Sequence, residues 1–148
     1  MKRQTTVKVK PIAPRELRDV IRVWRDSGLS YRPTGRDNPA RLKKQLRQNP
    51  RAFLAAYADG KMVGVALITD DGRKGWINRL AVLPEYRRKG VALALIRASE
   101  DSLRKNGIHL FCVNIESDNQ ESKDLFRKAG YAFESDILYF TKRERKDY

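Results

Sequence analysis

The sequence predicts a single α/β domain, residues 1–148, with a central mixed but mostly antiparallel sheet of about seven strands flanked by about four helices. Strand-like apolar segments alternate along the chain with helix-like segments, whose apolar residues recur every three to four positions. Tight-turn signals join consecutive strands in the first half, which favours antiparallel pairing there. A chain of 148 residues buries roughly 68–70% of its unfolded surface, which is enough for one core.

The first third predicts one strand and two helices. Thr6–Lys10 alternates valine with polar residues, as a half-buried strand does. Pro14–Asp26 is expected to be a helix, because proline suits the first helical turn and the apolar residues lie on one face. Ser27–Pro39 contains two glycines and two prolines, which indicates a loop. A short basic helix is expected over Ala40–Gln48, ending before an Asn-Pro pair.

Three strands follow in the middle of the chain. Ala52–Ala58 and Met62–Asp70 are apolar segments joined at Asp59-Gly60, a strong signal for a hairpin turn. A second hairpin turns on Asp71–Gly75 and leads into an apolar strand, Trp76–Leu83. These segments predict a three-stranded antiparallel unit.

The second half predicts a helix, a buried strand, a shorter helix and two final strands. These elements are expected at Val91–Asn106, His109–Ile115, Asn119–Ala129, Tyr131–Phe133 and Ile137–Thr141. Both helices have apolar residues at helical spacing and a glycine directly after them, as a helix end favours. The charged residues 142–148 are expected to fray.

The composition is strongly basic, with 32 Lys and Arg against 18 Asp and Glu and a formal net charge of +14. Residues 1–51 contain 15 of these cations and only 4 of the acids. Such a region attracts acidic partners such as nucleic acid, the ribosome or an acidic substrate segment. It also fits a surface that is only solvated, and both interpretations stay open. The sequence has no RNA motif with interleaved aromatics, zinc knuckle or evident helix-turn-helix.

Several classes of protein are not expected. The sequence has no run of about 18 apolar residues, so no membrane span is predicted. The basic N-terminus lacks the apolar segment of a secretory signal, which favours a cytoplasmic protein. One cysteine, Cys112, and one histidine argue against a disulfide framework and against a zinc site. The oligomeric state stays open, a homodimer included.

The most informative local feature is a basic glycine turn between the strand that ends at Leu83 and the helix that begins near Val91. Its residues are Arg87, Arg88, Lys89, Gly90, Val91 and Ala92. A turn that leads into a helix exposes main-chain N–H groups at the positive end of that helix, where phosphate groups bind. Glycine also lets a ligand approach the main chain closely. The turn therefore predicts a phosphate or pyrophosphate site.

Two motifs resemble the GNAT superfamily of N-acetyltransferases, and the order of the predicted elements is similar to theirs along nearly the whole chain. The first motif reads Leu80-Ala81-Val82-x-Pro84-x-Tyr86-Arg87-Arg88-Lys89-Gly90-x-Ala92. The second reads Asn119-x-x-Ser122-x-x-Leu125-Phe126-x-x-x-Gly130-Tyr131. The chain looks most like the subgroup of ribosomal-protein alanine acetyltransferases and their uncharacterised relatives. The resemblance implies an acetyltransferase whose cosubstrate is acetyl-CoA.

The resemblance also implies how acetyl-CoA is held. Main-chain N–H groups of the turn, with Arg87 helping, would bind the pyrophosphate. The strand edge at Leu80 and Val82 would bind the pantetheine amides, which requires the two central strands to splay apart. Phe126 would lie near the thioester. The implied cofactor-binding residues are Leu80, Ala81, Val82, Arg87, Arg88, Lys89, Gly90, Val91, Ala92, Asn119, Ser122 and Phe126.

The sequence departs from the family where catalysis is concerned. Many GNAT enzymes protonate the leaving thiolate with a tyrosine on the last helix, and Phe126 stands at that position. Glutamates on the splayed strands often act as general base, but the matching positions are Asn78 and Asn114, which do not titrate. Glu116 is the nearest carboxylate and would share the strand face of Asn114 if the strand continues. These three residues, Asn78, Asn114 and Glu116, are the candidate catalytic positions.

The missing groups favour one kind of acceptor. A thiol with a pKa of about 8.5 leaves readily, whereas a lysine amine at about 10.4 is far harder to deprotonate than an α-amine at about 7.7–8.0. We therefore expect transfer to an N-terminal α-amine or another weakly basic amine, on an acidic peptide or a ribosome-associated protein in preference to a small molecule. The acceptor is expected beside a basic wall that includes Arg32, Arg36, Arg41, Lys43 and Lys44. A non-catalytic acyl-CoA-binding module and a basic nucleic-acid- or ribosome-binding domain are the alternatives.

Overall fold

The computed structural model describes residues 6–148, so the basic start of the sequence lies partly outside the described residues. Within that range the chain forms an α/β fold, as predicted. Its elements are β1 (Lys8–Pro11), η1 (Pro14–Glu16), α1 (Leu17–Asp26), α2 (Pro39–Gln48), β2 (Phe53–Ala58), β3 (Lys61–Asp70), β4 (Gly75–Val82), η2 (Pro84–Tyr86), α3 (Val91–Lys105), β5 (Phe111–Cys112) and α4 (Gln120–Lys128).

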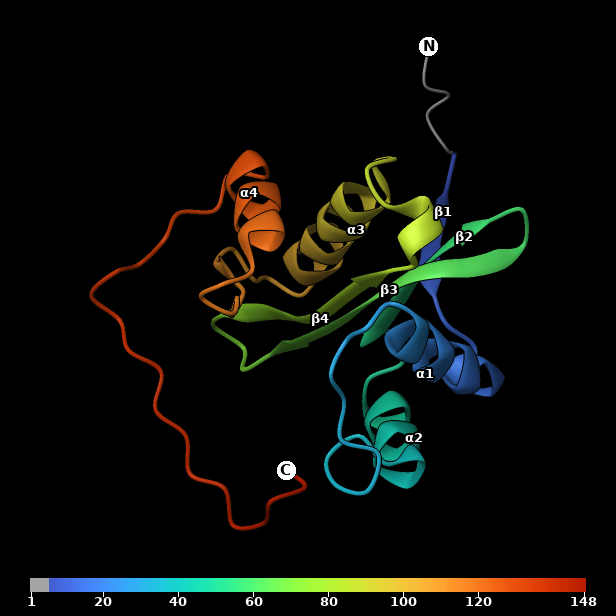
Figure 1. Ribbon diagram of the computed structural model, residues 1–148, viewed down its shortest axis with the longest axis horizontal. Coiled ribbons are helices and arrows are strands. Elements are labelled where there is room, and N and C mark those ends of the chain that lie inside the picture. The colour runs from blue at the N-terminus through green and yellow to red at the C-terminus, as the bar shows by residue number, and fades with distance from the viewer. Residues whose placement is uncertain (1–5) are drawn as a thin grey trace.

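The sheet has the order β1-β2-β3-β4-β5 and is mixed but mostly antiparallel. The first three pairings are antiparallel, and β4 pairs with β5 in parallel. Helices α3 and α4 lie on one face of the sheet, and α1 and α2 lie on the other (Figure 1). The sheet is therefore covered on both faces, which places the core in two layers.

Each layer of the core is filled by apolar side chains that the helical and strand periodicities predict. On the α1 side, the ring of Trp24 packs at 6.3 Å from the ring of Phe53 between centroids. On the α3 side, Leu95, Ile96 and Leu103 are almost fully buried. This packing is the main source of stability, because burying a large apolar side chain contributes about 1.5–3 kcal/mol.

Strands β4 and β5 stay together for only two residue pairs, Gly75 with Phe111 and Trp76 with Cys112. Beyond Trp76, the rest of β4 has no partner on that side within the described residues. A β-bulge lies close to this point, because Arg79 pairs with Leu67 and Ile77 pairs with Ile68, leaving Asn78 as the extra residue. The two strands therefore part, as the predicted splay requires, and leave an open edge along β4.

The prediction of two final strands is wrong. Residues 131–141 form no strand, so the sheet has five strands instead of about seven. The side chains of Phe133, Ile137, Leu138, Tyr139 and Phe140 are 72–86% exposed. Apolar and β-branched residues suit a pleated surface, but a strand also needs a neighbouring edge with which to pair. The described β5 offers only two paired residues, so the predicted strand His109–Ile115 is also shorter than expected.

The C-terminal segment instead runs away from α4 and returns to the sheet's other face, near α2 (Figure 1). Its last residues pack against the connection between α1 and α2, where a Cβ on Gly35 would overlap the main-chain oxygen of Asp147. Tyr148 is partly buried there. Whether residues 142–148 fray in solution stays a prediction. None of the helices described in residues 6–148 has the length and apolarity to span a membrane.

Candidate functional site

The basic glycine turn has the main-chain geometry that its composition predicts. After β4, the short helix η2 leads into Arg88 at φ 60° and Gly90 at φ 83°, and α3 begins at Val91. The left-handed region is strained for a residue with a side chain, so Arg88 is held there by the surrounding turn. Left-handed residues in a turn are typical of anion-binding nests, in which successive main-chain N–H groups converge on one ligand.

The N–H groups of this turn are free to bind a ligand. Gly90 caps α3 without any side-chain hydrogen bond. The first internal bond of the helix start is donated by the N–H of Ala94 to the oxygen of Gly90. Within residues 6–148, the N–H groups from Arg88 to Leu93 meet no acceptor. A run of unpaired donors at the positive end of a 15-residue helix is a site for an anion such as pyrophosphate.

A groove of about 680 Å³ lies directly over this turn. It brings together the turn, the end of β4, the residues that follow α1 and one side of α4 from its N-cap to its last residue. Its lining residues are Ser27, Gly28, Leu29, Leu80, Ala81, Val82, Tyr86, Arg87, Arg88, Gly90, Val91, Ala92, Leu93, Asn119, Glu121, Ser122, Leu125 and Lys128. Ten of the twelve residues that the resemblance implies for acetyl-CoA therefore share one groove. Lys89 and Phe126 are the two that do not line it.

The side chain of Arg87 holds the groove together. Its Nε donates to the oxygen of Val82 at 3.2 Å, and its Nη2 donates to the oxygen of Ser27 at 2.7 Å. The guanidinium thus joins the end of β4 to the end of α1 across the groove. The expected help from Arg87 in binding pyrophosphate stays a prediction, but this structural contact is an additional role that the sequence did not indicate.

The second motif places two polar residues on the groove and one aromatic residue behind it. Asn119 caps α4, where its Oδ1 accepts a hydrogen bond from the N–H of Ser122 at 3.0 Å. Phe126 is 3% exposed and packs edge to face on the ring of Tyr131 at 5.1 Å. The hydroxyl of Tyr131 donates to Oε2 of Glu100 at 2.7 Å, and burial together with this hydrogen bond raises the pKa of Tyr131.

The candidate catalytic residues do not meet in the groove. Asn78 lies in the bulge of β4 and donates from Nδ2 to Oγ1 of Thr69 at 2.7 Å. Asn114 and Glu116 are exposed beyond the end of β5. Among the lining residues, the carboxylate that does reach the groove is Glu121, in the first turn of α4. The pattern of the sequence did not single out Glu121, because an acidic residue is common at any helix start.

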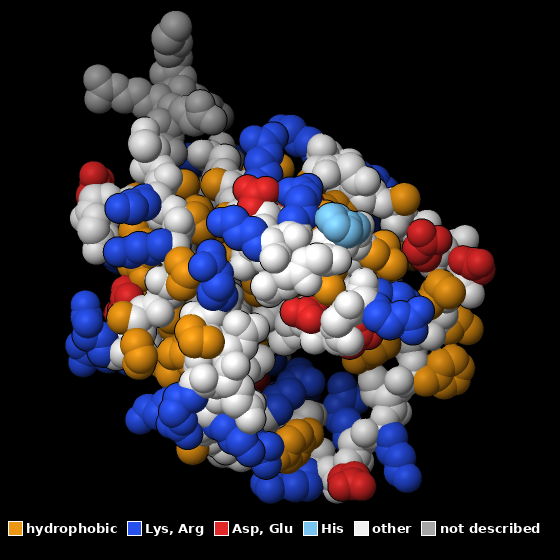
Figure 2. Space-filling view, turned by 180° about the vertical axis from the view of Figure 1, so that it is seen from behind, with side chains coloured by type: hydrophobic (Ala, Val, Ile, Leu, Met, Phe, Trp, Pro, Cys, Tyr) orange, Lys and Arg blue, Asp and Glu red, His pale blue; other side chains and the backbone are white. Residues whose placement is uncertain are grey.

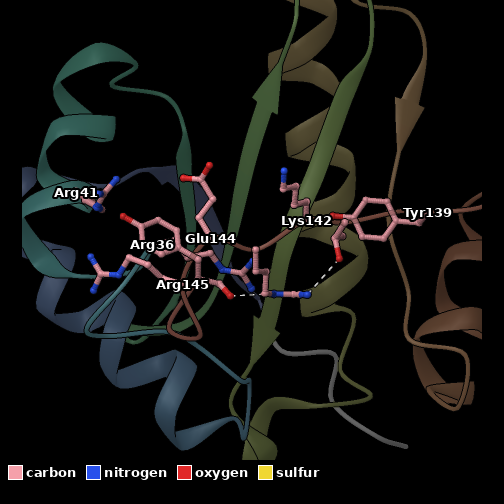
Figure 3. A pocket seen from close by; sticks show the side chains of 9 residues that line it. Arg36, Arg41, Tyr139, Lys142, Glu144 and Arg145 are labelled. Atoms are coloured by element: carbon pink, nitrogen blue, oxygen red, sulfur yellow. Dashed lines mark hydrogen bonds between the residues drawn. The ribbon is translucent and has the colours of Figure 1, made fainter.

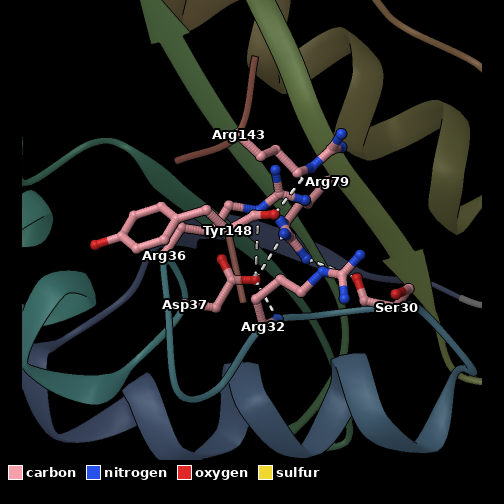
Figure 4. Close-up of polar contacts among 7 residues, drawn as sticks. All are labelled: Ser30, Arg32, Arg36, Asp37, Arg79, Arg143 and Tyr148. Carbon is pink, nitrogen blue, oxygen red and sulfur yellow. Dashed lines mark hydrogen bonds and ion pairs between the residues drawn. The ribbon is translucent and has the colours of Figure 1, made fainter. Parts of the chain in front are cut away.

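A buried ion pair next to the groove was not predicted. Arg79 on β4 donates to Oδ2 of Asp37 at 2.7 Å, and only 13% and 6% of these side chains are exposed (Figure 4). Its Nη1 also donates to the oxygen of Ser30 at 2.9 Å. The guanidinium lies 5.0 Å from the ring centroid of Trp24. Burial lowers the pKa of Arg79 and the charge of Asp37 opposes that shift.

These contacts fix the connection between α1 and α2 against β4. Arg87 holds its first residue, Ser27, and Arg79 holds it further on, at Ser30 and Asp37. The sequence predicts only a loop for this connection, because no local pattern links Asp37 with Arg79, 42 positions later. Together, the turn, the β4 edge and the α1–α2 connection form a groove with free N–H donors at one end.

Comparison with known proteins agrees with this geometry. A family model described as "Acetyltransferase (GNAT) family" matches residues 17–131. An acetyltransferase of Sodalis glossinidius is 30% identical over 129 residues, which cover 87% of this chain and 83% of that protein.

Two solved structures have the same fold. The PaiA N-acetyltransferase of Thermoplasma acidophilum, in complex with coenzyme A, has a TM-score of 0.75 and 20% identity, covering 87% of this chain and 91% of that one. A ribosomal-protein-alanine N-acetyltransferase of Brucella melitensis has a TM-score of 0.68 and 20% identity, covering 93% and 99%. With the family model spanning most of its length, the chain belongs to the GNAT family of acetyltransferases.

Proposed function

We propose that the protein transfers the acetyl group of acetyl-CoA to a primary amine, and that this amine is the N-terminal α-amine of a peptide or protein. The donor side rests on the run of unpaired N–H groups from Arg88 to Leu93, all of which except that of Lys89 belong to residues that line the groove. The acceptor side follows from Asn78 and Asn114, which stand where the family's general base is expected and cannot take up a proton.

On the side of the acetyl donor, we propose a role for each part of the groove. As a member of the GNAT family the chain is an acetyltransferase, and acetyl-CoA is its cosubstrate. The N–H groups of the turn would bind the pyrophosphate. The open edge of β4 at Leu80–Val82 would bind the pantetheine amides as an added strand does. Asn119 and Ser122 would border the pantetheine arm from α4.

The acceptor must bring an amine that loses its proton without a strong base. Asn78 and Asn114 do not titrate, Glu116 is exposed beyond β5, and Phe126 has no proton to donate. Each pKa unit of the amine above the working pH adds about 1.4 kcal/mol to the barrier when only the neutral form attacks. An α-amine at about 7.7–8.0 therefore has a large advantage over a lysine at about 10.4.

The reaction needs little more than correct placement. The amine nitrogen attacks the thioester carbonyl carbon, the carbon–sulfur bond breaks, and coenzyme A leaves as a thiolate. The proton released by the nitrogen passes to water or to the thiolate. A thiolate leaves without a general acid because the pKa of its thiol is only about 8.5. Positioning the two reactants is the larger source of rate. The similarity to a ribosomal-protein-alanine N-acetyltransferase supports a protein acceptor.

The test compares two amines in one assay. The first peptide has a free α-amine and no lysine, and the second has an acetylated N-terminus and one lysine. Each is incubated with the protein and acetyl-CoA, and mass spectrometry measures how fast it is acetylated. At pH 7 we expect the α-amine to react on the order of 10²-fold faster, from the difference in neutral fraction. At pH 9.5 the preference should fall to roughly tenfold, because the α-amine is then fully neutral. Equal rates at pH 7 would contradict the proposed acceptor.

A further inference from the structure

A second cavity, of about 700 Å³, lies between the N-terminal helices and the C-terminal segment. Arg36 and Arg41 border it from the α1–α2 connection and from α2, and the segment that ends at Tyr148 borders it from the other side (Figure 3). Its charged lining residues are Arg36, Arg41, Lys142, Arg143, Arg145 and Glu144. Five cations against one acid make it strongly positive.

Most of this charge is not neutralised by the chain itself. Arg36 is 4.0 Å from Asp37, whose carboxylate is already bound by Arg79 at 2.7 Å. Arg41 lies 5.0 Å from the ring centroid of Tyr148, and among residues 6–148 it makes no ion pair. Two of the lining cations do have a partner: Arg145 pairs with Asp147, and Arg143 donates from Nε to the oxygen of Tyr148 at 2.9 Å. Figure 2 shows Lys and Arg side chains bordering a hollow in the lower part of the molecule.

The cavity and the groove share one wall. The α1–α2 connection lines the groove with Ser27, Gly28 and Leu29, and it lines the cavity with Arg36. Arg79, which directly precedes Leu80, contacts this connection at Ser30 and Asp37, and Figure 4 shows it beside Arg36 and Arg143. The α1–α2 connection therefore contributes residues to both the cavity and the donor groove.

We propose that the cavity selects the acceptor, and that the acceptor is a peptide with acidic side chains close to its reacting α-amine. This inference rests on the proposed function. Planar guanidinium groups bind carboxylates through two parallel hydrogen bonds, and two such groups, those of Arg36 and Arg41, border the cavity without an ion pair shorter than 4.0 Å. A peptide carries both the amine that the groove needs and the carboxylates that the cavity attracts. Nucleic acid offers the anions but no aliphatic amine.

The test uses two peptides with the same free N-terminus, one with Asp and Glu at its second to fourth positions and one with Asn and Gln. We expect kcat/KM to be at least tenfold higher for the acidic peptide at 50 mM salt. At 0.5 M salt the ratio should fall below about threefold, because exposed charges are then screened over a few ångströms. Binding of the acidic peptide, with its N-terminus blocked by acetylation, is measured in parallel by fluorescence anisotropy.

Two variants of the same helix separate the cavity from the general charge of the protein. Arg41→Gln removes a cation that lines the cavity, and Arg47→Gln removes an exposed cation of α2 that does not line it. Both change the net charge by one unit. We expect Arg41→Gln to weaken binding of the acidic peptide about fivefold or more and to lower the acidic-to-neutral ratio. Arg47→Gln should leave the affinity for the acidic peptide and the acidic-to-neutral ratio of kcat/KM within about 1.5-fold of the wild type.

The outcomes distinguish this inference from the proposed function. Equal acetylation of both peptides would overturn the inference and leave acetyl transfer intact. Binding that depends on Arg41, with neither peptide acetylated, would support the cavity's ligand and contradict the proposed acceptor. Neither acetylation nor Arg41-dependent binding would overturn both. Displacement of the peptide by single-stranded RNA at a lower concentration than by an acidic peptide of equal charge would assign the cavity to nucleic acid instead.

Discussion

The donor groove and the basic cavity are built from different parts of the chain. The groove presents main-chain N–H groups and a strand edge, which the fold holds in place from Leu80 to Leu93. The cavity presents the ends of long charged side chains on a loop, a helix and the C-terminal segment. Recognition by the main chain depends on backbone angles, whereas recognition by side chains depends on charge and salt. Acetyl-CoA binding should therefore respond to different changes than acceptor selection does.

The largest effect is expected where the two regions join. Arg79→Met removes the closest cation from the carboxylate of Asp37, which is 6% exposed and keeps only the N–H of Arg32 at 2.6 Å and Arg36 at 4.0 Å. Removing one member of a buried ion pair costs on the order of 3–5 kcal/mol. We expect a loss of that size in the free energy of unfolding, measured by urea denaturation.

The double variant Arg79→Met with Asp37→Asn is the control, because it removes the unpaired charge. It should recover part of the lost stability. If Arg79→Met alone lowers the free energy of unfolding by less than about 1 kcal/mol, the ion pair does not hold the two regions together.

Substitutions of the glycines at the two ends of α3 distinguish an effect on acetyl-CoA binding from an effect on stability. Gly90→Val places a β-branched residue at φ 83°, which costs about 1–2 kcal/mol, and puts its side chain among the free N–H groups. We expect acetyl-CoA to bind at least tenfold more weakly, as measured by calorimetry. Gly107→Val is the matched control, since Gly107 has φ 81° and open space around its Cα. It should lose similar stability and keep acetyl-CoA binding, and a loss of binding in both variants would contradict the assigned site.

Replacing Phe126 by the tyrosine that many GNAT enzymes have at this position should change the rate of acetyl transfer only slightly. Phe126→Tyr adds a hydroxyl at a 3% exposed position behind the groove, against the ring of Tyr131. Because the thiolate leaves without a general acid, we expect kcat with an α-amine acceptor to change by less than about threefold. Phe126→Leu controls for packing. An increase of tenfold or more in the tyrosine variant alone would show that protonation of the thiolate limits the rate.

The smallest effect is expected from the two carboxylates near the donor side. Glu121 lines the groove from α4 and Glu116 is exposed beyond β5. Neither lies on the part of β4 where the strands separate, so Glu121→Gln and Glu116→Gln should each keep kcat/KM within about twofold. The check is a pH–rate profile from pH 6 to 9. A tenfold loss together with a missing acidic limb in either variant would identify that residue as the general base.

Local patterns predicted the elements well where the apolar residues alternate or recur regularly. The helices at α1, α2, α3 and α4 and the hairpin between β2 and β3 begin and end within a few residues of their predicted limits. The prediction of a strand at Ile137–Thr141 was wrong, and the reason cannot be found in the local sequence pattern. Strand-forming residues need an edge to pair with, and β5 pairs over two residues only.

Local sequence alone is enough to specify the turn that carries the free N–H donors. Three cations, a glycine and the start of an amphipathic helix are consecutive from Arg87 onward, so the geometry of the turn is local. What surrounds that turn depends on long-range packing. The ion pair of Arg79 with Asp37, the contact of Arg87 with Ser27 and the cavity between α2 and the C-terminal segment join residues more than 40 positions apart. Such contacts form because the whole core packs at once, and no short stretch of sequence encodes them.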